Sequence, residues 1–179
     1  GALAGAPINV VRGRTVDLLI PAEAEIVIEG YLDTVNLEPE GPFGESHGHV
    51  ALEEFNIPMR VTAITHRKNA IVASYLSQVT PSESSAMKRV AYEPMFFAHL
   101  RNTLGIRGVK RVTLHERMTA LRRICIITLE KGTPHTEVWR ALYGATSLRA
   151  DCGKICIAVD DDIDPDNSDA LFWAIAFRM

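Results

Sequence analysis

At 179 residues the chain can form one large domain or two small ones, and its 47% hydrophobic and 23% charged residues are typical of a globular protein. Its net charge of −3, with scattered basic residues, argues against nucleic-acid binding, and no run of about 18 apolar residues could span a membrane. The cysteines Cys125, Cys152 and Cys156 fit neither a disulfide framework nor a zinc site, so we expect free thiols in a reducing cytoplasm.

The first 80 residues predict strands and turns. Apolar and alternating runs favour strands at 16–20, 25–32, 59–65 and 70–76. The last two, separated by the polar residues 66–69, predict a hairpin. Between them, the proline- and glycine-rich stretch 38–49 predicts irregular structure. Because no helical period occurs here, an antiparallel barrel or sandwich fits this half.

A long helix is predicted next. The sequence Thr80-Pro81-Ser82-Glu83 is typical of a helix start, and the apolar residues that follow are spaced by three and four. Pro94 should kink this helix and Gly105 should end it. The stretch is long enough to link two domains.

The remainder alternates strands and helices. We expect strands at 109–115, 123–130 and 154–160, and helices that begin near Thr133 and span 168–177. Thr133 is the expected N-cap of the first, with Pro134 in its first turn. Trp139 and Trp173 fall at expected core positions. This order predicts a small layered α/β domain.

The loop 40–45, Glu-Gly-Pro-Phe-Gly-Glu, is the strongest candidate for chemistry. Glycine lets a backbone approach a ligand, and two nearby carboxylates can differ in pKa, so that one donates a proton. On composition alone, a surface turn with solvated acids explains the loop equally well.

Several motifs together resemble the UbiD family of decarboxylases. These are PAEAEIVIEGYL (21–32), EPEGPFGESHG (38–48), THRKNAI (65–71), the Thr-Pro-Ser-Glu helix start at 80–83 and VDDDID (159–164). The resemblance covers essentially the whole chain. It implies a reversible non-oxidative decarboxylase of an aromatic, heteroaromatic or α,β-unsaturated acid that uses prenylated FMN.

The resemblance also implies an α+β fold in three parts. Residues 1–80 would be the second half of an FMN-binding-like split β-barrel, residues 81–108 a linker helix, and residues 109–179 a C-terminal α/β dimerisation domain. We therefore expect a homodimer or a higher homo-oligomer.

Site residues follow from matching the family motif position by position. Glu45 matches the acid that protonates the carbon losing CO2, and Glu40 matches the acid that braces a catalytic arginine. Met87 and Lys88 fall where the linker helix covers the substrate pocket, although a core methionine and a solvated lysine explain them too.

Other parts of the family site have no match. The arginine and the ligands of a divalent metal (manganese or magnesium, with potassium a further candidate ion) lie upstream of the segment resembling Gly1–Pro7. The family's flavin-contacting lysine has no clear counterpart near Leu148-Arg149-Ala150. Both ends look cut, so a missing N-terminal part or a companion chain is expected to supply the rest.

Less favoured alternatives remain. His47 and His49 could bind a metal from one face of a strand, and the acidic run 160–166 resembles a calcium loop, although its Pro165 replaces the required glycine. Asp166, Asn167 or Ser168 is a better candidate for a helix cap. For the whole chain, the alternatives are a non-catalytic assembly or dimerisation module and a plain flavin oxidoreductase.

Overall fold

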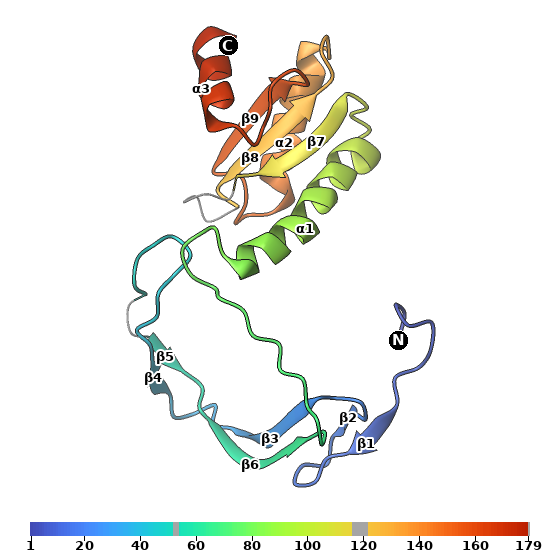
Figure 1. The fold of residues 1–179 in the computed structure, drawn as a ribbon, viewed down its shortest axis with the longest axis vertical. Helices are drawn as coiled ribbons and strands as arrows, with labels where there is room; N and C mark the ends of the chain where they lie inside the picture. The colour runs from blue at the N-terminus through green and yellow to red at the C-terminus, as the bar shows by residue number, and fades with distance from the viewer. Residues whose placement is uncertain (52–53, 116–121, 179) are drawn as a thin grey trace. The chain divides into compact units, whose positions relative to one another are not determined.

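The computed structural model describes residues 1–51, 54–115 and 122–178, which form two compact units, one whose described elements are strands and one of mixed α/β structure (Figure 1). Unit 1 comprises Gly1–Phe43 and Ala51–Ser74, and unit 2 comprises Gly44–Val50 and Tyr75–Met179.

The described strands of unit 1 form three separate antiparallel pairs. The pairs are β1 (Val10–Arg12) with β2 (Leu19–Pro21), β3 (Ile26–Leu32) with β6 (Met59–His66), and β4 (Glu38–Glu40) with β5 (Glu54–Asn56). The split barrel predicted for this half remains a prediction, because these two-stranded sheets do not themselves form one.

The β3–β6 pair exposes its apolar side chains on both faces. Ile28 and Ile64 are register partners with 54% and 61% of their surface exposed, and Tyr31 is 53% exposed. Glu29 alone on β3 is buried. Its carboxylate accepts hydrogen bonds from the backbone amides of Arg14, Thr15 and Val16, so it fastens the β1–β2 turn to β3.

Two expectations for this half are wrong. Residues 70–76 form no strand, and β6 pairs with β3 instead. The Glu25 side chain binds the Arg67 side chain and the backbone amide of Ile71, so the chain after β6 is held beside the start of β3 and does not fold back along β6. Glu38–Glu40 is a short strand despite the proline and glycine around it. Its partner β5 supplies the long-range pairing that local composition could not reveal.

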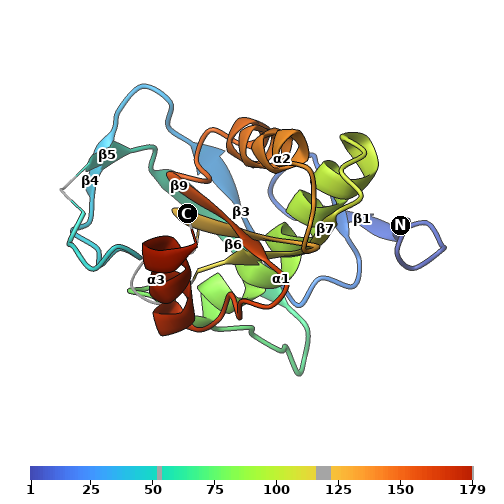
Figure 2. The same ribbon diagram turned by 90° about the horizontal axis from the view of Figure 1, so that it is seen from above.

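Unit 2 contains one three-stranded sheet with helices on its two faces. Its elements are α1 (Glu83–Ala98), the π-helical turn η1 (His99–Thr103), β7 (Val109–Leu114), β8 (Ile124–Leu129), α2 (His135–Leu148), β9 (Ile155–Asp160) and α3 (Ser168–Phe177). The strand order is β7-β8-β9; β7 and β8 are antiparallel, whereas β8 and β9 are parallel and joined through α2. Figure 2 shows α2 and α3 on opposite sides of the sheet.

Alternation along β8 builds two cores. Cys125 and Ile127 join a cluster that includes Phe96 of α1 and Ala141 of α2. On the other face, Ile126 packs with residues around α3, including Leu171. The predicted layered α/β arrangement of this half is therefore present.

The N-terminus of α1 matches its prediction. Ser82 caps the helix, and its side chain and that of Ser85 exchange hydrogen bonds with each other's backbone amides. The helix passes through Pro94 and continues as η1, and Gly105, at φ +71°, follows the helical end as expected.

Thr133 is not the cap of α2. Pro134 occupies that position, and the Thr133 hydroxyl donates to the Glu130 carbonyl oxygen at 2.6 Å, so the hydroxyl is used within the preceding turn. The final helix spans Ser168–Phe177 as predicted, with Asn167 as its cap.

The expectation that both tryptophans are core residues is also wrong. Trp139 is 49% exposed and Trp173 is 47% exposed, because α2 and α3 turn smaller residues such as Ala141 and Ala174 toward the sheet. Among the residues that the structure describes, no helix is long and apolar enough to cross a lipid bilayer.

Candidate active site

Glu40 stands at the end of β4, where the chain changes direction. Its backbone pairs with Glu54, and the Asn56 side-chain amide donates a hydrogen bond to its carboxylate. Gly41 follows at φ +100°, a conformation that side chains other than glycine's rarely adopt. The pairing of β4 with β5 therefore fixes where this acid leaves the sheet.

Glu45 lies in a tight turn that belongs to unit 2. Gly44 bridges to Val50, the amide of Glu45 donates to the carbonyl oxygen of His49 (2.9 Å), and the amide of Gly48 donates to the carbonyl oxygen of Glu45 (3.0 Å). The Glu45 carboxylate is exposed, and no side chain or amide within the described ranges hydrogen-bonds it. The turn thus presents a carboxylate to an incoming ligand.

This turn packs on the segment that precedes α1. A Cβ atom on Gly44 would lie 3.4 Å from the Gln78 side chain, and one on Gly48 would lie 3.6 Å from Val79. Gln78 and Val79 in turn line a depression beside the helix start, together with Leu76, Pro81, Ser82, Glu83 and Ala86. Because both distances are ordinary van der Waals separations, the Glu45 turn lies against the segment that lines this depression.

A second depression follows along the same helix and contains both predicted substrate residues. Its lining residues are Tyr75, Ser84, Met87, Lys88, Ala91 and Tyr92. Met87 is 51% exposed, so it is not the core methionine of the alternative interpretation. Lys88 forms no ion pair with a described carboxylate, which leaves its ammonium group able to bind a ligand.

The structure therefore brings Glu45, Met87 and Lys88 into one unit, whereas Glu40 belongs to unit 1. Sequence reasoning missed Tyr75, Tyr92 and Gln78 as lining residues. Tyr92 could have been found, since it lies four residues after Lys88 on a helix and shares its face. Tyr75 could not, because it lies in a run that was expected to be a strand.

The two histidines after Glu45 are adjacent but do not form a metal site. Their ring centroids are 5.3 Å apart, and Nδ1 of His47 accepts a hydrogen bond from the amide of His49 at 3.2 Å. In the part of the chain that the structure describes, no group of three or more His, Cys, Asp or Glu side chains is placed to hold a metal ion. The described residues therefore do not offer a ligand set for the divalent metal that the resemblance implies.

The acidic run before α3 serves structure. Asp162 pairs with Arg178, and Asp166 accepts hydrogen bonds from Arg89 and Arg111 at 2.6 Å each. Partial burial alone would raise the pKa of Asp166, but the two guanidinium groups outweigh it and lower the pKa. The calcium-loop alternative is wrong for these residues, because their carboxylates bind arginine side chains or backbone amides of the turn.

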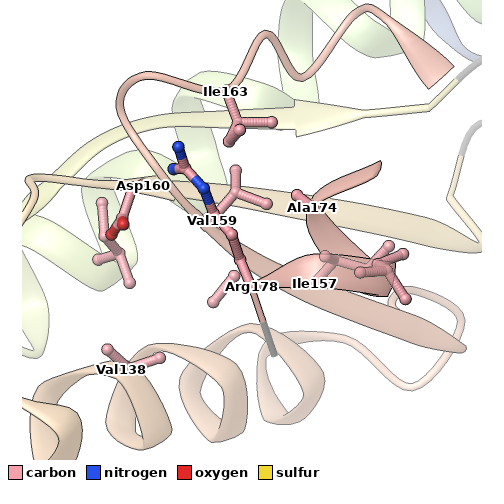
Figure 3. Close-up of a pocket in the computed structure, with 10 residues that line it drawn as sticks. Val138, Ile157, Val159, Asp160, Ile163, Ala174 and Arg178 are labelled. Carbon is pink, nitrogen blue, oxygen red and sulfur yellow. The ribbon is translucent and has the colours of Figure 1, made fainter. Parts of the chain in front are cut away.

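A separate cavity is lined by residues of β9, of α3 and of the loop between them, and by Val138 of α2 (Figure 3). Figure 3 shows Val159, Ile163 and Ala174 around it, with Asp160 and Arg178 as the charged lining residues. The guanidinium of Arg178 contacts both carboxylate oxygens of Asp162, at 2.7 and 2.8 Å. Because this cation is already neutralised, the cavity lacks a free positive charge for an acid substrate, and it lacks the Glu45 turn.

Comparison with known proteins defines the family. Residues 1–79 match the 3-octaprenyl-4-hydroxybenzoate carboxy-lyase Rift-related domain, and residues 85–179 match the C-terminal domain of the same family. The chain belongs to the UbiD family of carboxy-lyases, as its motifs predicted.

Three relatives illustrate the similarity. An uncharacterised protein of Archaeoglobus fulgidus is 30% identical over 96% of this chain and 35% of its own length. An evolved dimeric form of the UbiD-class enzyme HmfF from Pelotomaculum thermopropionicum, in complex with prFMN, is 30% identical, with a TM-score of 0.77 over 96% of this chain and 39% of its own. The 3,4-dihydroxybenzoic acid decarboxylase AroY of Klebsiella pneumoniae is 27% identical, with a TM-score of 0.75 over 100% of this chain and 38% of its own.

The chain thus spans between 35% and 39% of the length of these relatives. Its mixed α/β fold is that of UbiD-class structures, and their flavin complexes associate the family with a flavin cofactor.

Proposed function

We propose that the protein containing this chain is a reversible decarboxylase of an aromatic, heteroaromatic or α,β-unsaturated acid that uses prenylated FMN. The observation that carries the proposal is the exposed Glu45 carboxylate on a tight turn beside the depression that Gln78 and Val79 line at the start of α1, in a chain of the UbiD family. Relatives described as an HmfF–prFMN complex and as a 3,4-dihydroxybenzoic acid decarboxylase support both the reaction and the cofactor.

Glu45 is the proton donor in this proposal. Loss of CO2 leaves an electron pair on carbon that must take up a proton, and a protonated carboxyl group in reach of that carbon supplies it. When bound, a prenylated flavin would supply an electron sink for the electron pair that the breaking C–CO2 bond leaves on the substrate. The turn at Gly44 and Gly48 sets the backbone of Glu45, so only its side chain must adjust to the substrate.

The second depression suits an aromatic or unsaturated acid. Tyr75, Met87 and Tyr92 provide apolar and aromatic surface, and Lys88 provides a cation with no described carboxylate partner. A flat apolar molecule with one carboxylate requires this combination. Met87 and Lys88 are accordingly proposed to contact the substrate.

Glu40 is proposed as a positioning residue. Asn56 holds its carboxylate at the end of β4, which would let it brace an arginine supplied from elsewhere. That arginine, the divalent metal (manganese or magnesium), potassium and the remaining flavin contacts are proposed to come from an N-terminal part or a companion chain. The complete enzyme is proposed to be a cytoplasmic homodimer or higher oligomer.

Replacement of Glu45 tests the proposal directly. In the complete, flavin-loaded protein, Glu45→Gln should lower turnover by about a hundredfold or more, the range for loss of a positioned acid, while the flavin absorbance stays unchanged. Glu38→Gln, the same change on an exposed acid of β4, is the matched control and should retain activity. Full turnover by Glu45→Gln would remove Glu45 from the role.

A specific observation supports a second function, that of an assembly module. On α3, Phe172 is 69% exposed and Phe177 is 76% exposed, so this helix offers apolar surface to another chain. Native mass spectrometry of the purified protein distinguishes the two functions. A longer or partnered species that releases a prenylated flavin on denaturation supports the enzyme, whereas a flavin-free assembly supports the module.

A further inference from the structure

The three cysteines of unit 2 meet at one end of the parallel strand pair, on the sheet face covered by α1 and α2. Cys125 of β8 and Cys156 of β9 are register partners, and Cys152 belongs to the same buried cluster from the loop before β9. The sequence indicated free thiols but gave no reason for them to gather. Within the described residues, no group of three or more His, Cys, Asp or Glu side chains is placed to hold a metal ion.

Cys125 and Cys156 are close enough to form a disulfide bond. Neighbouring strands run about 4.8 Å apart, and this falls within the roughly 4.4–6.8 Å between Cα atoms that disulfides span. Both side chains point to the same face, because register partners in adjacent strands do so, and Cys156 packs against the cluster that contains Cys125. Neither thiol is oxidised in this structure.

The two thiols are unequal in reactivity. The pKa of Cys125 is raised because its thiol donates a hydrogen bond to Cys156 and because it is fully buried. The pKa of Cys156 is lowered because it accepts that hydrogen bond, and Cys156 is only partly buried. Cys156, whose thiol also lies 3.9 Å from the carbonyl oxygen of Gly153, is therefore the more accessible and the more readily deprotonated thiol of the pair, with Cys125 as its register partner on β8.

Cys152 has neither the lowered pKa nor the partial exposure of Cys156. Its sulfur lies 3.7 Å from the Asp151 carboxylate, and burial together with this negative charge raises its pKa. Only 6% of its surface is exposed. It serves as an internal control with nearly the same location and the opposite electrostatics.

We propose that Cys125 and Cys156 form a peroxide-reactive dithiol that closes reversibly into a disulfide between β8 and β9. The Cys156 thiolate attacks one oxygen of a hydroperoxide, the O–O bond breaks, and the other oxygen takes a proton and leaves as water or an alcohol. Cys156 is now a sulfenic acid. The Cys125 thiol attacks its sulfur, the S–O bond breaks, and the oxygen leaves as water with the proton of Cys125. Two electrons pass from the thiols to the peroxide, and a small-molecule thiol restores the pair.

Peptide mapping tests the pairing, because trypsin separates the three cysteines. Cleavage after arginine and lysine leaves Cys125 in residues 124–131, Cys152 in residues 150–154 and Cys156 in residues 155–178. After the purified full-length protein is treated with hydrogen peroxide and its free thiols are alkylated, we expect peptides 124–131 and 155–178 to be joined. The link should vanish on reduction, and Cys152 should remain alkylated and unlinked.

Variants assign the roles. Cys152→Ser should retain the link, Cys156→Ser should abolish it, and Cys125→Ala should leave a sulfenic acid at Cys156 that dimedone traps. If Cys125→Ala fails to fold, the wild-type peptide map still decides. Absence of any link after peroxide, or a link that involves Cys152, would overturn the proposal. The inference is independent of the decarboxylase activity, since the readout is the mass of the peptides.

Discussion

The two units differ in how many hydrophobic side chains they bury. The buried hydrophobic residues of the described chain, from Phe96 to Ala174, lie in unit 2, which therefore has a core of its own. Among the described residues of unit 1 the one buried residue is Glu29, an acid that binds backbone amides, while most apolar residues of β3 and β6 remain exposed. A two-stranded sheet is marginal in water without a face to pack against. We therefore predict that unit 2 holds its fold alone and that unit 1 needs a further surface to pack against.

The largest expected difference concerns amide hydrogen exchange. In the isolated chain, amides of β7, β8 and β9 should exchange about a hundredfold or more slowly than those of β3 and β6, because exchange from a packed core requires larger unfolding. Mass spectrometry of exchanged peptides measures both sets in one sample. Equal protection in the two units would break the comparison. In the complete protein we expect β3 and β6 to become protected.

The next largest difference is expected in the loss of unfolding free energy caused by matched leucine substitutions in the two units. Leu114→Ala removes a fully buried side chain from unit 2 and should cost about 2–5 kcal/mol of unfolding free energy. Leu32→Ala removes a side chain that is 63% exposed in unit 1 and should cost little in the isolated chain. Urea denaturation of the two variants provides the test. A large loss for Leu32→Ala in the complete protein alone would identify Leu32 as part of an interface.

The smallest expected effect is acid release of the turn near Glu29. The pKa of Glu29 is lowered because the amides of Arg14 and Thr15 donate to its carboxylate, so the contact stabilises the fold above the ordinary glutamate pKa of about 4.3. The stabilisation should be lost as the pH falls through the lower pKa of the folded state. The amide resonances of Thr15 and Val16 should shift in that range. In Glu29→Gln they should be altered at neutral pH and insensitive to acid, and an unchanged titration in that variant would contradict this role.

Elements whose own residues decide their structure were predictable. The final helix at Ser168–Phe177 follows from an apolar run and its Asn167 cap, and the start of α1 follows from Ser82 and its neighbours. The family and the identity of the acidic loop were also accessible, because PEGPFGE is a continuous motif. The prediction of strand pairing failed where the partner strand was distant in sequence. We expected residues 59–65 to pair with residues 70–76, whereas β6 pairs with β3.

By itself, the sequence determined the family, the strand and helix periods of unit 2, and Glu40, Glu45, Met87 and Lys88 as candidates. These features rest on residues close together in the chain, whose local chemistry is readable in order. Only the tertiary structure decided that the Glu45 turn packs beside the Gln78 segment, that Trp139 and Trp173 face outward, and that Cys125 meets Cys156. Each depends on contacts between residues far apart in sequence, and these are set by packing rather than by local preference.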